Sequence, residues 1–92
     1  MDKRDILIYL KLVEHRWNGG TGAREIHKEL RGEIPLANIQ RRLNAMKLEH
    51  IAAQTGRRKW ITTEEGLLSE ETHESILNLL ESEFRGFEPS KN

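Results

Sequence analysis

Four polar side chains whose hydrogen-bonding groups suit nucleic-acid bases lie close together in the middle of the chain. They are Asn38, Gln40, Arg41 and Asn44. An Asn or Gln amide can pair bidentately with adenine, and an Arg guanidinium with guanine. Both pairings need an element narrow enough to enter the major groove, as a helix is. We therefore expect these four residues to read bases from one exposed helix face.

A basic run, Arg57-Arg58-Lys59, follows directly after Gly56. The flanking segments IAAQ and KWIT indicate two short strands, so this run is expected at a hairpin tip where Gly56 supplies a positive φ. Cations at such a tip meet phosphates or the adjacent minor groove, where they add affinity but little sequence information. Trp60, on the second strand, is expected to pack the hairpin against the helices.

Apolar spacing predicts the helix that carries the four polar residues. Within residues 36–50, Ile39, Leu43 and Met46 recur at i, i+4 and i+7, the spacing of one buried helical face. A second helix is predicted over residues 22–31, with Thr21 as its N-cap and Gly32 after its end. Two short helices joined by a tight turn form a helix-turn-helix.

Two further helices are expected near the chain ends. The first covers residues 5–17 and ends at Asn18-Gly19-Gly20. Its broad buried face is expected to hold Ile6, Leu10, Val13 and Trp17, with Tyr9 and Leu12 beside them. The last begins after the cap Thr63, re-initiates at Ser69 and runs to about residue 84. Its apolar residues cover adjacent faces, which predicts that this helix packs against a partner. The proposed interface residues are Ile76, Leu77, Leu80 and Phe84. The alternative is packing against the first helix of the same chain.

The predicted order is therefore helix, helix, helix, strand, strand, helix, a mainly α fold with a small β-hairpin in the α+β class. At 92 residues the chain has room for one core. Residues 1–66 are assigned to the DNA-binding unit, residues 67–86 to a C-terminal dimerisation helix, and residues 87–92 to a loose tail.

The stretch TGAREIHKELRGEIPLANIQRRLNAMKLEHIAAQTGRRKWITTEEG resembles the winged helix-turn-helix domains of MarR-, PadR- and ArsR-like transcription regulators. The resemblance implies that Thr21 and the tip residues contact the DNA backbone and that the terminal helix forms a homodimer. His50 and Thr62 depart from the pattern, at positions where Gly and Leu are common. The chain is short for a ligand-binding domain, so any small-molecule effector is left open.

The charge distribution agrees with a DNA partner although the formal net charge is zero. Residues 35–62 carry six Lys/Arg against one Asp/Glu, whereas residues 63–92 carry two against eight. One surface can then face phosphates while another faces away from them. The absence of cysteine excludes disulfides, thiol nucleophiles and thiolate zinc sites. The longest apolar run is far too short to span a membrane, and a cytoplasmic location is expected.

No enzymatic constellation is recognised. His15, His27, His50 and His73 are widely spaced and form no close ligand pair, and no glycine-rich phosphate loop is present. Structural roles are expected for all four histidines, with no cofactor and no metal. The leading hypothesis is a small homodimeric transcription regulator, with repression favoured over activation, that binds specific double-stranded DNA. The alternatives are a winged-helix protein-interaction module and a non-specific architectural DNA binder.

Overall fold

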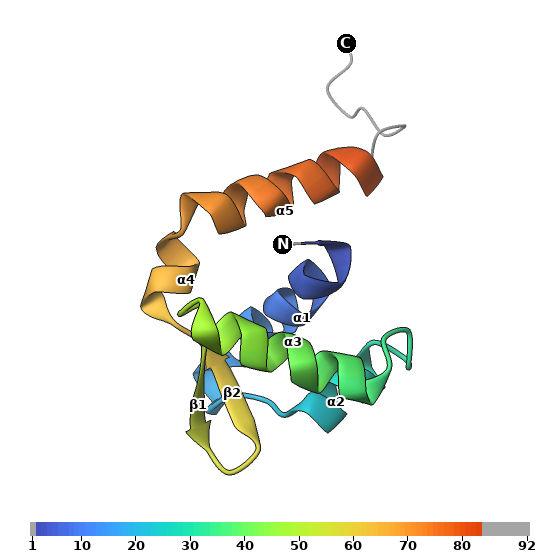
Figure 1. Cartoon of the computed structure of the whole chain (residues 1–92), viewed down its shortest axis with the longest axis vertical. Coiled ribbons are helices and arrows are strands. Elements are labelled where there is room, and N and C mark those ends of the chain that lie inside the picture. Colours follow the sequence, from blue (N-terminus) through green and yellow to red (C-terminus); the bar gives the residue numbers. More distant parts are fainter. Residues whose placement is uncertain (1, 84–92) are drawn as a thin grey trace.

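The computed structural model describes residues 2–83, which form helices and one antiparallel two-stranded sheet (Figure 1). The elements in chain order are α1 (Lys3–Glu14), the 3-10 turn η1 (Arg16–Asn18), α2 (Ala23–Glu29), α3 (Leu36–Leu48), β1 (Ala52–Gly56), β2 (Lys59–Thr62), α4 (Glu64–Leu68) and α5 (Glu70–Glu83). A mainly helical α+β fold with a small hairpin is confirmed. The tail predicted from residue 87 lies outside the described residues.

The core lies between α1, α2, α3 and the hairpin. The predicted apolar stripe of α3 is confirmed, because Ile39, Leu43 and Met46 are all buried in one cluster. Trp60 on β2 is 7% exposed and joins this cluster, so it packs the hairpin against the helices as expected. The break before the last helix is also confirmed at Ser69, whose Oγ accepts a hydrogen bond from the backbone N–H of Thr72.

The predicted buried face of α1 is partly wrong. Ile6, Tyr9 and Leu12 are buried as predicted. Leu10 is instead 42% exposed and Trp17 83% exposed, and Ile8, which was not predicted, is fully buried. The run from residue 6 to residue 10 is entirely apolar, so its spacing does not fix which side faces the core. The helix also ends at Glu14, before Trp17, which places that indole in η1 and off the helical face.

The N-cap of α2 is Gly22, which corrects the prediction of Thr21. Glu25 replaces a capping side chain: its Oε2 accepts the Gly22 backbone N–H at 3.0 Å and the Thr21 hydroxyl at 2.9 Å. Thr21 itself pairs through both backbone groups with Trp60, at 3.0 and 2.8 Å, and therefore lies along the open edge of β2. This pairing fixes the start of α2 against the hairpin.

The hairpin turn differs from the prediction at Gly56. The positive φ falls on Arg58, at 61°, and not on Gly56. The strands pair Gln54 with Trp60 and Gly56 with Lys59, so the register shifts between Gln54 and Gly56. This irregularity absorbs one extra residue of β1 and leaves Arg57 and Arg58 alone in the turn.

The C-terminal helix α5 packs against α1 and against α4. Ile76 is half-buried against the core of its own chain, which agrees with the alternative packing for this helix; its place in a dimer interface stays a prediction. Leu77 and Leu80 lie on the neighbouring flank and are 65% and 45% exposed. Phe84, the fourth residue of that predicted interface, lies outside the described residues. The apolar stripe of α5 therefore divides into an inner face and an exposed flank.

Candidate nucleic-acid interface

The outer face of α3 carries three of the four predicted base-reading residues. Gln40, Arg41 and Asn44 are all exposed, on the opposite side of the helix from Ile39 and Met46. The Asn44 amide donates to the Gln40 backbone carbonyl at 3.0 Å. This local hydrogen bond uses one amide proton, so the other groups of the two amides can still meet a partner.

Gln40 and Asn44 lie beside a groove of about 540 Å³ between α3, the start of α2 and the hairpin. The groove has polar side chains from three elements around an apolar base. The polar residues are Gln40 and Asn44 from α3, Arg24 and Glu25 from α2, and Gln54 and Arg58 from the hairpin; Leu43 and Trp60 line it as well. Arg41 is exposed but does not line the groove.

Asn38 stands apart from the other three polar residues. It is half-buried, and its Oδ1 accepts a hydrogen bond from Nε of Arg42 at 2.9 Å. Arg42 in turn donates to Asp2 at 2.8 Å and to Asp5 at 2.9 Å, which ties α3 to the start of α1. The Asn38 side-chain oxygen is therefore engaged within the fold, and its role in reading bases stays a prediction. The spacing of four residues between Asn38 and Arg42 on one helix could have predicted this hydrogen bond from the sequence.

This contact perturbs the acid at the start of α1. The pKa of Asp2 is lowered, first by the hydrogen bond from the Asp5 backbone N–H and next by the hydrogen bond from Arg42. The hydrogen bonds from Arg42 to the carboxylates of Asp2 and then Asp5 raise the pKa of Arg42. Arg42 is consequently a cation of α3 that two carboxylates of α1 already neutralise.

The three basic tip residues are all exposed, and Arg58 reaches the groove. Close packing of the hairpin against α2 sets their position, because a Cβ on Gly22 would lie only 2.5 Å from the Arg58 carbonyl oxygen. Thr21 is 1% exposed and its hydroxyl is donated to Glu25. Its side chain therefore positions the hairpin from inside, which corrects its predicted contact with the DNA backbone.

A carboxylate also lies in this otherwise basic groove. The pKa of Glu25 is lowered, first by the hydrogen bond from the Gly22 backbone, then by that from the Thr21 hydroxyl, and in part by the charge of Lys59. Glu25 is therefore ionised at neutral pH. It supplies an acceptor among donors, and a carboxylate can accept from the amino group of cytosine.

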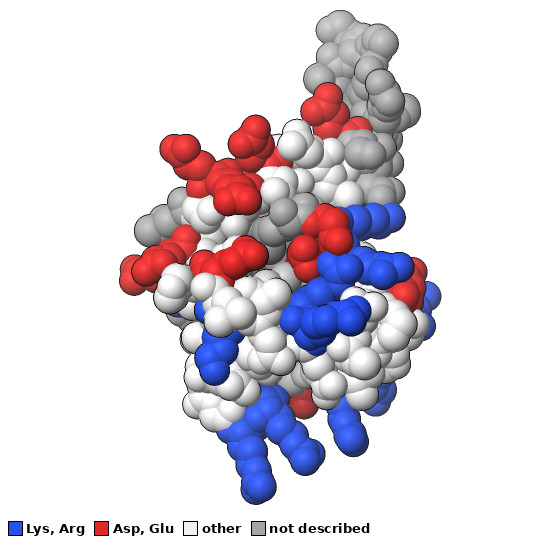
Figure 2. Space-filling view, in the orientation of Figure 1, with Lys and Arg blue, Asp and Glu red and all other residues white. Residues whose placement is uncertain are grey.

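Charges separate along the molecule in the face shown in Figure 2. Lys and Arg side chains project at the end formed by the hairpin and α2 and also cluster over the middle of this face, whereas Asp and Glu side chains gather over α4 and α5 at the other end. The charge asymmetry along the sequence is thus also an asymmetry in space. An anion approaching the hairpin end meets positive potential, and the acidic helices lie away from it.

The histidines differ in their surroundings. Nδ1 of His27 lies 2.8 Å from the Ile34 carbonyl oxygen and holds the turn between α2 and α3, in keeping with its predicted structural role. His50 follows α3 with φ at 62°, a left-handed conformation that glycine adopts more readily. His15 lies beside Glu14 and Glu29, a grouping that sequence spacing did not reveal.

The comparisons with known proteins assign neither a family nor a function to this chain. No protein-family model, curated protein or solved structure matches this chain. Across residues 2–83, none of the helices has the length and apolar content required to cross a membrane.

Proposed function

We propose that this chain is a winged-helix domain that binds double-stranded DNA and serves in the cytoplasm as a small homodimeric transcription regulator, most simply a repressor. The observation that carries the proposal is the groove in which Gln40 and Asn44 of α3 face Arg58 of the hairpin. A helix that presents amides beside a basic hairpin tip supplies both base-reading groups and phosphate-binding cations.

The two parts have separate tasks. α3 enters the major groove, where Gln40, Arg41 and Asn44 select the sequence. Arg57, Arg58 and Lys59 contact phosphates or the adjacent minor groove and supply sequence-independent affinity. The acidic surface of α4 and α5 faces away from the DNA, where its repulsion of phosphates is screened beyond roughly 8–10 Å of salt solution.

Binding to random duplex over a range of salt concentrations tests DNA contact. In an Arg57→Ala, Arg58→Asn variant, Asn at position 58 suits the left-handed φ of 61°. Each lost phosphate contact lowers the slope of log affinity against log salt by about 0.9. A fourfold rise in salt should therefore weaken the wild-type protein roughly twelvefold more than this variant, if both cations meet phosphates.

Arg4→Ala is the control for this experiment. Arg4 is an exposed cation at the start of α1, far from the hairpin in the fold (Figure 1). Its replacement should reduce neither the affinity nor the salt slope as the tip variant does. No binding of random duplex at low salt would overturn the proposal, as would equal effects of the tip and Arg4 variants.

The homodimer rests on the exposed flank of α5. Leu77 and Leu80 lie three residues apart on one side of the helix, so a two-fold copy could bury both. A Leu77→Asp, Leu80→Asp variant should have half the wild-type mass by light scattering. Leu48→Asp is the control and should keep the wild-type mass, because Leu48 lies on α3 and is even more exposed, at 82%. A monomeric wild-type protein would contradict the dimer while leaving DNA binding intact.

A further inference from the structure

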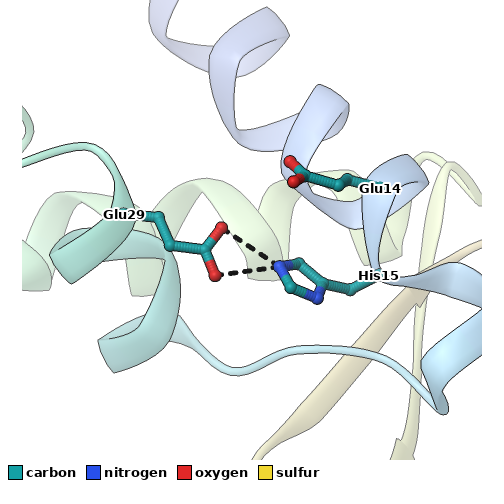
Figure 3. Close-up of side chains that lie close together, drawn as sticks. All are labelled: Glu14, His15 and Glu29. Atoms are coloured by element: carbon teal, nitrogen blue, oxygen red, sulfur yellow. Dashed lines mark hydrogen bonds and ion pairs between the residues drawn. The ribbon is translucent and has the colours of Figure 1, made fainter.

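Three potential metal ligands meet where the end of α1 approaches α2. They are Glu14, His15 and Glu29, whose candidate ligand atoms all lie within 4.8 Å of one another. Figure 3 shows the carboxylate of Glu29 directed at the His15 imidazole from across the gap between the helices. The set combines one nitrogen with two carboxylates from two different elements, and only folding brings them together.

The distances within the set suit a shared ion. Nε2 of His15 lies 2.9 and 3.0 Å from the two carboxylate oxygens of Glu29. Metal–nitrogen and metal–oxygen bonds near 2.1 Å place neighbouring ligands of one ion roughly 2.9–3.4 Å apart. His15 and Glu29 are therefore as close as adjacent ligands of one ion, and an ion would replace the hydrogen bond that now joins them. Glu14 supplies a third ligand from the residue beside His15.

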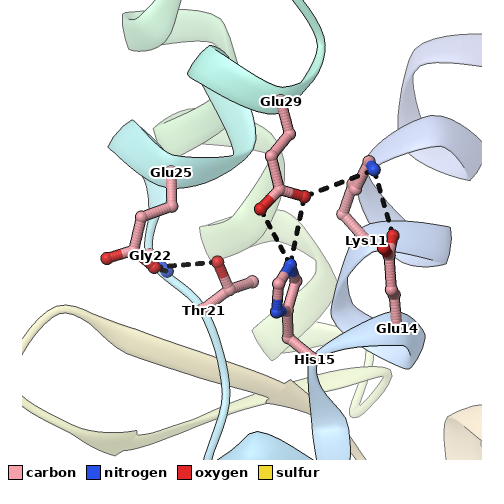
Figure 4. Close-up of polar contacts among 7 residues, drawn as sticks. All are labelled: Lys11, Glu14, His15, Thr21, Gly22, Glu25 and Glu29. Carbon is pink, nitrogen blue, oxygen red and sulfur yellow. Dashed lines mark hydrogen bonds and ion pairs between the residues drawn. The ribbon is translucent and has the colours of Figure 1, made fainter.

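The chain itself holds a positive charge at this place. The Lys11 ammonium lies 3.0 Å from Oε2 of Glu14 and 3.3 Å from Oε1 of Glu29, between the two carboxylates (Figure 4). The Lys11 side chain is 24% exposed and has a flexible four-carbon stem, so it can turn toward solvent. A divalent ion would bring twice the charge of the ammonium group and would also coordinate the lone pair of the imidazole nitrogen.

We propose that Glu14, His15 and Glu29 bind a divalent first-row transition metal ion of the Zn²⁺ type and that Lys11 competes with it. The imidazole ligand favours Zn²⁺, Co²⁺ or Ni²⁺ over Mg²⁺ and Ca²⁺, which prefer oxygen ligands. Water completes the coordination. The bound ion joins the end of α1 to α2, and it stabilises the fold independently of any DNA contact.

Titration of the metal-free full chain with Zn²⁺, followed by calorimetry, tests the site. His15→Gln and Glu29→Gln should each weaken binding at least tenfold, as the loss of a ligand should cost no less than the loss of an outer-shell partner. Lys11→Met should instead strengthen it, because the competing cation is gone. Glu33→Gln, which removes an exposed carboxylate outside the set, is the control and should leave affinity unchanged.

The direction of the Lys11→Met effect separates a three-ligand site from adventitious binding by one surface histidine. Adventitious binding would respond to His15→Gln but not to Lys11→Met or Glu29→Gln, and that result would overturn the proposal. Thermal unfolding gives a second readout, in which Zn²⁺ should raise the Tm of the wild type and of Lys11→Met but not of His15→Gln. An equal rise with Mg²⁺, or no rise in the wild type, would also overturn it.

Discussion

Gly22 is the point at which the hairpin rests on α2, and its replacement gives a sharp test of the fold around the candidate interface. A Cβ there would lie 2.5 Å from the Arg58 carbonyl oxygen, whereas ordinary contacts begin at 3.4 Å. The Gly22→Ala chain must therefore separate the hairpin and α2 by roughly 0.9 Å, and overpacking of this kind costs about 1–3 kcal/mol.

Urea denaturation of three variants measures this cost. Gly22→Ala should lose about 1–3 kcal/mol of unfolding free energy. Gly56→Ala is the control, since a Cβ on Gly56 meets nothing within 4 Å and its φ is not positive. That variant should be neutral or up to about 1 kcal/mol more stable, because alanine restricts the unfolded chain.

Gly22→Ser separates the clash from the loss of an N-cap. Serine is a better N-cap residue than alanine, so a pure capping effect would leave Gly22→Ser as stable as the wild type. The close approach to Arg58 predicts instead that serine and alanine both destabilise the protein. Equal stability of Gly22→Ser and wild type would refute the reasoning.

Two further predictions follow from the backbone at residue 50 and the charge at residue 2. His50→Gly should raise the unfolding free energy by up to about 1 kcal/mol, because an L-residue is strained at a φ of 62°; a decrease on urea denaturation would contradict this. Asp2→Asn should cost less than about 1 kcal/mol near pH 7, since the side chain of Asp2 is 59% exposed. The lowered pKa of Asp2 means that its charge stabilises the fold above its unfolded value of 3.8 and that this contribution is lost as pH falls through the folded value. Wild type and Asp2→Asn should therefore converge in stability below about pH 4, and a gap that widens there would argue against it.

Periodic spacing predicted the parts of the fold that a single buried face determines. Ile39, Leu43 and Met46 recur at helical spacing and are separated mainly by polar residues, so only one side of α3 could face the core. The continuous apolar run at the start of α1 does not show which side of the helix faces the core. The prediction that Leu10 is buried was therefore wrong. The left-handed φ at Arg58 was missed because the most permissive residue, Gly56, was assumed to take it.

The positions of the candidate site residues could be predicted where the helical pattern alone decides their exposure. Gln40, Arg41 and Asn44 are exposed on one helix, as their pattern indicated. The pattern did not predict the hydrogen bonds that hold the side chains of Asn38 and Thr21 within the fold, from Arg42 and to Glu25 respectively. The grouping of Glu14 and His15 with Glu29 depends on how α1 meets α2, which no local pattern encodes.

The central claim is that α3 selects the DNA sequence while the hairpin tip supplies general affinity. The most direct measurement is the ratio of affinities for a duplex selected from a random library and for random duplex. Gln40→Ala should lower this ratio about 5- to 150-fold, the effect of losing 1–3 kcal/mol of base discrimination. Arg57→Ala should weaken both affinities and leave their ratio unchanged. A ratio that Gln40→Ala leaves intact, or that Arg57→Ala lowers as strongly, would contradict the claim.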